Sequence, residues 1–111
     1  MPLNIIQYGS DEDMVRNYVN EKIGANYIRK LDAAGGWIYF DEKGLTFKSH
    51  AINIHKGETR IEYADIQHVK KRRTMGVVPN GISVYTKDNF EHKFVIRNRE
   101  DVIEFLKSKM S

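Results

Sequence analysis

The chain has 111 residues, no cysteine and a nearly balanced charge, with 18 Lys plus Arg against 15 Asp plus Glu. Its 41% hydrophobic and 30% charged residues are typical of one small soluble globular domain. The lack of cysteine excludes disulfides, thiolate chemistry and cysteine-based zinc or iron–sulfur sites.

Residues 1–24 are predicted to form an arm followed by a helix. The first nine residues show no clear period, whereas Ser10 and Asp13 have the spacing of a capping box. The apolar residues that follow recur on neighbouring helical positions and stop before Gly24, which predicts a helix over Asp11–Ile23. These apolar residues are Met14, Val15, Tyr18, Val19 and Ile23.

From Ala25 onward the apolar period changes to two, and turn residues separate the alternating stretches. This pattern predicts seven antiparallel strands joined by hairpins. The predicted strands are Asn26–Leu31, Trp37–Phe40, Leu45–Ala51, Arg60–Tyr63, a bent or bulged strand from Ile66 through Val69, Ile82–Lys87 and Phe90–Arg97. The segment Thr74–Gly81 is expected to be a loop.

The last element is predicted to be a helix over Asn98–Ser108. Asn98 and Asp101 have capping-box spacing, and an apolar face follows them. Seven short strands and one amphipathic helix indicate a mainly β fold, either two orthogonal sheets or an open barrel that the helix plugs. We expect residues 25–111 to form this domain and residues 1–24 to pack with it as a single unit.

Four segments, in this order and spacing, resemble the GRAM and bacterial pleckstrin-homology-like (PH-like) domains. Gly36–Phe47 is similar to their opening hairpin, and Ile61–Val69 to a characteristic strand and turn. Gly81–Phe94 is similar to their penultimate hairpin, and Asp101–Leu106 to their closing helix. The resemblance covers roughly residues 25 to 110 and implies a barrel of about seven antiparallel strands closed by a C-terminal helix.

The resemblance also implies a binding function. PH-like domains are binding modules without catalytic machinery of their own; some bind phosphoinositides and many bind proteins. In the lipid-binding members a basic cluster usually lies at the first hairpin. Here the corresponding link, Asp32–Gly36, contains no Lys or Arg.

The excess positive charge lies in one cluster, Lys70, Lys71, Arg72 and Arg73. Without these four residues the chain has 14 basic against 15 acidic side chains, so basic residues do not recur as they do in nucleic-acid-binding domains. On an anionic membrane the cluster would bind headgroups while the loop residues Met75, Val77 and Val78 insert. The alternative is a solvated strand edge whose charges deter aggregation.

The sequence shows no constellation of reactive side chains, so we expect no catalytic residues, no cofactor and no metal. Nucleophile-elbow, P-loop and dinucleotide motifs are absent. His50 and His55 are five positions apart and would lie on opposite faces of a strand. His92 alternates in phase with the apolar residues around it, which predicts a core or rim histidine with a hydrogen-bond partner.

The stretch Trp37–Phe40 is apolar on both faces of its predicted strand. Trp37 and Tyr39 share one face, and an exposed apolar strip of this kind usually marks an interface. The N-terminal helix or a second copy of the protein would cover it. We therefore expect a non-catalytic module that binds a protein partner or itself, with weak binding to anionic membranes or phosphoinositides as the alternative and nucleic acid disfavoured.

The sequence also predicts where the protein is found. No apolar run approaches the roughly 18 residues that a transmembrane helix needs. The N-terminus has neither the basic nor the apolar region of a signal peptide. We expect a cytoplasmic protein, with peripheral membrane attachment as the alternative.

Overall fold

The structure, a computed structural model, describes residues 15–50, 58–74, 76 and 78–110. It is mainly β, with one α-helix at the C-terminus, as the changes of apolar period predict. The elements are β1 (Lys22–Ile28), β2 (Ala33–Phe40), β3 (Gly44–Ser49), β4 (Glu58–Glu62), the 3₁₀ turn η3 (Tyr63–Asp65), β5 (Ile66–Thr74), β6 (Val78–Thr86), β7 (Glu91–Ile96) and α1 (Arg99–Lys109).

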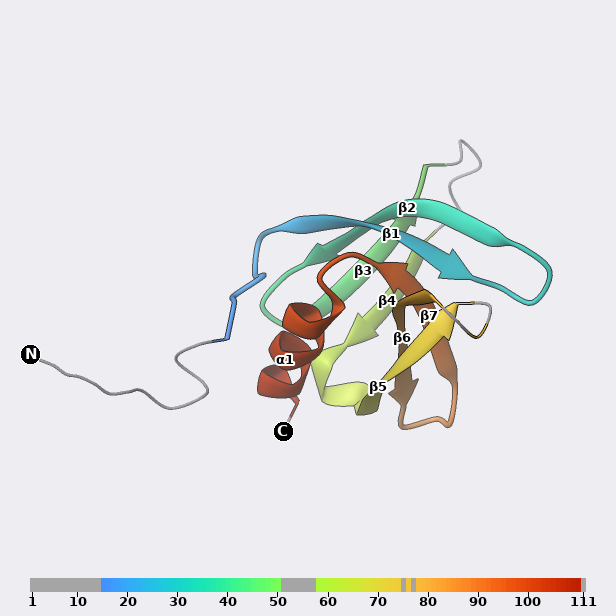
Figure 1. Ribbon diagram of the computed structural model, residues 1–111. Coiled ribbons are helices and arrows are strands. Elements are labelled where there is room, and N and C mark those ends of the chain that lie inside the picture. Colours follow the sequence, from blue (N-terminus) through green and yellow to red (C-terminus); the bar gives the residue numbers. More distant parts are fainter. Residues whose placement is uncertain (1–14, 51–57, 75, 77, 111) are drawn as a thin grey trace, which may run out of the picture.

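The seven strands form one antiparallel sheet in the order β4-β3-β2-β1-β7-β6-β5. The sheet curls into a half-barrel, and α1 lies against its inner side at one end (Figure 1). Because β4 and β5 end the strand order, they are the edge strands of the described sheet.

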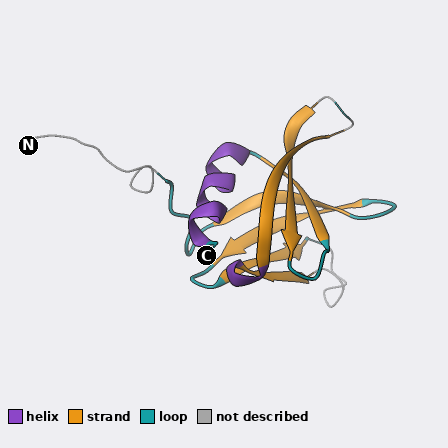
Figure 2. Ribbon diagram, turned by 90° about the horizontal axis from the view of Figure 1, so that it is seen from below, coloured by secondary structure: helices purple, strands orange, loops and turns teal. Residues whose placement is uncertain are grey.

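The core lies between the concave face of the sheet and α1, and the view from below again shows α1 at one end of the curled sheet (Figure 2). Every strand contributes a buried apolar side chain, and α1 contributes Val102, Ile103, Phe105 and Leu106. The Phe105 ring meets three aromatic rings edge-on, with centroid distances of 5.4 to 5.8 Å. These rings belong to Tyr18, Phe40 and Tyr63.

The predicted helix over Asp11–Ile23 is wrong for the residues that the structure describes. Residues 15–21 form a bend and a turn, and β1 begins at Lys22. The Asn17 side chain accepts a hydrogen bond from the Val19 amide at 2.9 Å, and Asn20 has a φ of 70°, so both residues break a helix. Positions 11–14 lie outside the described residues.

The predicted loop over Thr74–Gly81 is shorter than expected. β5 continues to Thr74, and β6 begins at Val78, so three residues separate the two nine-residue strands. The expected irregularity near Ile66 is confirmed, because the pairing of β5 with β6 shifts register between Ile66 and His68. Asn98 stands at the start of α1, as expected, but its side chain makes no capping hydrogen bond.

Candidate binding groove

A broad groove opens where β1 and β7 separate. β7 pairs with β1 only from Ala25 to Ile28, whereas β1 pairs with β2 along its whole length from Lys22. After Ile96 the chain leaves the sheet and turns into α1. The space between the diverging segments has a volume of about 1090 Å³ and is open to solvent.

The charged side chains that line the groove all have the same sign. Arg16, Lys22, Arg97 and Arg99 line it, together with His50. No aspartate or glutamate is among the described residues of its lining. Since focused charge of one sign attracts ligands of the opposite sign, the groove suits an anionic ligand.

Two of these arginines have hydrogen-bond partners in the described part of the chain, and a third makes no ion pair there. The Arg99 guanidinium donates to the carbonyl oxygens of Arg72 and Gly81 at 2.8 and 3.2 Å, which ties the start of α1 to the β5–β6 hairpin. Arg16 donates to Glu21 at 2.6 Å, and this bond raises the pKa of the arginine. Arg97 is exposed and makes no ion pair with the described residues.

Trp37 forms an aromatic wall of the groove on the outer face of β2. The Lys22 ammonium lies 4.6 Å from the ring centroid, and the His50 ring meets the indole edge-on at 5.8 Å. Trp37 is 36% exposed, and Tyr39 beside it is 38% exposed. The two aromatic residues predicted to form an interface therefore lie together on the outer face, while Ile38 and Phe40 face the core.

The basic residues Lys70–Arg73 lie on β5, an edge strand, and strand alternation divides them between two faces. Lys71 is 2.8 Å from the Glu100 carboxylate on α1. Arg72 is half-buried and folds over Gly81, where its Cγ lies 2.7 Å from the position that a Cβ would take. The four cations therefore do not present one common surface.

Val78 is the residue of the predicted membrane-inserting loop that the structure describes. It is 44% exposed, at the start of β6 and opposite Thr74. Met75 and Val77 lie outside the described residues.

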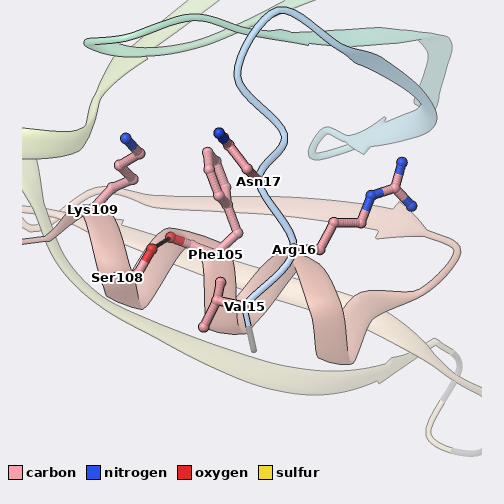
Figure 3. Close-up of a pocket in the computed structure, with 6 residues that line it drawn as sticks. All are labelled: Val15, Arg16, Asn17, Phe105, Ser108 and Lys109. Atoms are coloured by element: carbon pink, nitrogen blue, oxygen red, sulfur yellow. Dashed lines mark hydrogen bonds between the residues drawn. The ribbon is translucent and has the colours of Figure 1, made fainter. Parts of the chain in front are cut away.

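A second, smaller pocket of about 220 Å³ lies between the segment preceding β1 and α1 (Figure 3). Phe105 lies at its centre, and Arg16 and Lys109 lie on opposite sides of it. The Ser108 hydroxyl is already used, because it donates to the Phe105 carbonyl at 2.6 Å. We regard this pocket as the seam along which the N-terminal segment packs on the helix.

The three histidines that the structure describes, His50, His68 and His92, form no common site. His92 is half-buried, and its Nδ1 lies 2.8 Å from the Tyr27 hydroxyl, so the predicted hydrogen-bond partner is present. Burial lowers the pKa of His92 below its usual value of 6.5. Within the described residues no three His, Asp or Glu side chains come together in a way that could hold a metal ion. His55 lies outside the described residues.

No helix in the described part of the chain is both long and apolar enough to cross a bilayer.

The comparisons with known proteins support the architecture. No protein-family model and no curated protein matches the chain. Among solved structures, the C-terminal domain of an unknown protein from Leishmania infantum is similar, with a TM-score of 0.70 and 18% identity over 82% of each chain. At this identity the similarity shows the fold alone.

Proposed function

We propose that this chain is a non-catalytic binding module of the PH-like (GRAM) type, and that its partner is a protein. The seven-stranded curled sheet with a C-terminal helix is the architecture that the resemblance implies. The observation that carries the functional proposal is the groove between β1 and β7, which is lined by four cationic side chains and no described carboxylate.

The aromatic residues beside the groove favour a protein as the partner. Trp37 and Tyr39 are both more than a third exposed, and they stand on the same outer face of β2. Aromatic residues and arginine are enriched at the centres of protein interfaces, where they supply much of the binding energy. An interface that includes the groove and both rings would combine these residue types on one surface.

The proposal is tested by sedimentation and pull-down of the purified protein and of a variant with Trp37→Ala and Tyr39→Ala. We expect self-association or retention of a specific protein by the native chain, and loss of either in the double variant. Phe90→Ala is the matched control, because Phe90 is 52% exposed and lies outside the groove. A native chain that stays monomeric and retains no protein beyond those held by the double variant would contradict the proposal.

A second candidate function is weak binding to anionic membranes through β5. The observation that favours it is the exposed Val78 beside the end of the basic strand. Lys70, Lys71, Arg72 and Arg73 would contribute about 1 kcal/mol each, which gives about 4 kcal/mol and only millimolar affinity. The ion pair between Lys71 and Glu100 would reduce the affinity for the membrane further.

Co-sedimentation with vesicles of increasing phosphatidylserine content tests this second candidate. Binding through β5 should weaken as added salt shortens the Debye length from about 10 Å at 0.1 M towards about 3 Å at 1 M. It should be lost when Lys70, Lys71, Arg72 and Arg73 are all replaced by Ala. Equal binding to neutral vesicles, or no loss in this variant, would exclude the membrane function.

A further inference from the structure

We propose that the groove binds an acidic, extended segment of the partner protein, which lies along Lys22–Gly24 of β1 and pairs with the main chain of Lys22. This inference rests on the proposed protein-binding function and names the chemistry of the ligand. It follows from the hydrogen-bonding direction of β1, from the open outer face at Gly24 and from the charge of the lining.

Alternate residues of β1 direct their main-chain N–H and C=O groups towards the groove. The Arg29 amide donates to the Asp32 carbonyl, and the Phe40 amide donates to the Glu21 carbonyl, so both ends of the β1–β2 ladder are fixed. Hydrogen-bonded pairs alternate along an antiparallel ladder, which assigns Ile23, Ala25 and Tyr27 to bonds with β2.

The residues between them face the other way. The main-chain groups of Lys22 and Gly24 therefore point away from β2, towards the side where β7 lies further along the strand. The pair of Ala25 with Ile96 ends the ladder with β7 and places the main chain of Arg97 opposite Gly24, so the groups that open into the groove are those of Lys22. An extended segment in the groove would form a hydrogen-bonded pair with Lys22, as in other cases of strand addition to a sheet edge.

The outer face of β1 is open at Gly24. Gly24 has no Cβ, and the atom nearest to a Cβ built there is Trp37 Cζ3 at 3.9 Å, an ordinary contact distance. Side chains of a bound peptide can therefore lie over this stretch with the indole of Trp37 as one wall.

The charge of the lining selects an acidic occupant. Carboxylates of an extended segment would meet the exposed Arg97 and Lys22 first, and then Arg99 and Arg16. A nucleic acid offers no main-chain amides for strand pairing, and the groove has one indole where single-strand binding needs several stacking platforms.

Trp37 gives a direct readout, because it is the single tryptophan of the chain and lines the groove. The probe is a capped ten-residue peptide of alternating Glu and Thr, titrated into the full chain while the tryptophan emission is followed. We expect a saturable change that weakens as salt is added. A peptide of alternating Lys and Thr and an oligonucleotide of ten thymidines are the comparison probes, and neither should saturate at the same concentration.

Arg97→Ala tests the charge contribution without disturbing the core, because Arg97 is exposed and lies outside the strands and α1. We expect it to weaken binding of the Glu–Thr peptide by about threefold to tenfold. The matched control is Lys107→Ala, an exposed cation on α1 that does not line the groove, and it should leave binding within about twofold.

Strand pairing is tested on the peptide, so that no variant needs to fold. Two versions of the Glu–Thr peptide carry N-methyl groups on alternate residues, one version on each edge of the extended chain. Main-chain pairing with Lys22 predicts that one version loses binding and the other keeps it, since only one edge of the peptide faces β1.

Equal binding of both methylated versions and the parent would overturn the inference, as would equal or tighter binding of the Lys–Thr peptide or the oligonucleotide. The protein-binding proposal would still hold after these results if the native chain retains a partner that the Trp37→Ala, Tyr39→Ala variant loses. Both proposals would be contradicted if the native chain retains no partner and no probe changes the Trp37 emission.

Discussion

At the scale of single residues, Asp41 fixes the turn between β2 and β3. Its carboxylate accepts hydrogen bonds from the amides of Lys43 and Gly44 at 2.8 and 3.0 Å, and from the Arg60 guanidinium at 2.5 and 3.2 Å. The hydrogen bond from Arg60, with the two amides, lowers the pKa of Asp41 from 3.8 to about 2. The turn is therefore held by a carboxylate that stays ionised in mild acid.

Asp41→Asn should reduce the free energy of unfolding at pH 7 by about 1 kcal/mol, a value reduced for the partial exposure of the pair. Because the folded pKa is below the unfolded one, the contribution is present above about pH 4 and is lost as the pH falls towards 2. Urea unfolding at pH 7, 4 and 2.5 should show the native and variant curves converging. Glu42→Gln, an adjacent exposed carboxylate, is the control; an equal loss in both variants would refute this role of Asp41.

His92 gives a second pH-dependent prediction. Burial lowers its pKa, so the unfolded chain binds a proton more readily than the folded one when the pH falls below 6.5. The free energy of unfolding should therefore decrease from pH 7 to 5, and His92→Gln should flatten this dependence. NMR titration of the His92 ring should give a midpoint below 6.5, and a midpoint at or above that value would contradict the burial argument.

At the scale of elements, strands and the C-terminal helix follow from apolar period, whereas the N-terminal helix does not. Val15, Tyr18, Val19 and Ile23 have helical spacing, and they do pack on the core, but from a turn and a strand. The spacing of apolar residues indicates which side chains are buried, but it does not determine whether a helix, a turn or a strand places them in the core. The signal against a helix was Asn20, whose positive φ and amide bond to the Phe40 carbonyl set the turn before β1.

The packing of α1 on the half-barrel supplies a stability prediction for this element. Leu106 is 0% exposed, so Leu106→Ala removes buried methyl groups and leaves a cavity. The expected cost is about 2 to 5 kcal/mol of unfolding free energy, measured by urea denaturation followed by circular dichroism. Lys107→Ala on the exposed side of the same helix should change stability by less than about 0.5 kcal/mol. Native stability of Leu106→Ala would argue against the helix as part of the core.

At the scale of the whole molecule, the groove could not be predicted from the sequence. Its cations come from positions as far apart as Arg16 and Arg99, and no local pattern links them. The apolar spacing predicts Gly24 as a helix stop, whereas in the structure Gly24 lies within β1. The contiguous run Lys70–Arg73 is the strongest basic pattern in the sequence, but alternation on β5 separates its side chains. Alternation places Trp37 and Tyr39 on the face opposite Ile38 and Phe40, and the structure shows that Ile38 and Phe40 are the pair that faces the core.

An amide-resolved NMR titration of ¹⁵N-labelled protein with the Glu–Thr peptide shows whether the groove between β1 and β7 is the binding surface. We expect the shift changes to concentrate on the amides of Lys22–Gly24 and Arg97–Arg99 and on the indole of Trp37. Changes confined to β5, or no changes at millimolar peptide, would contradict this expectation.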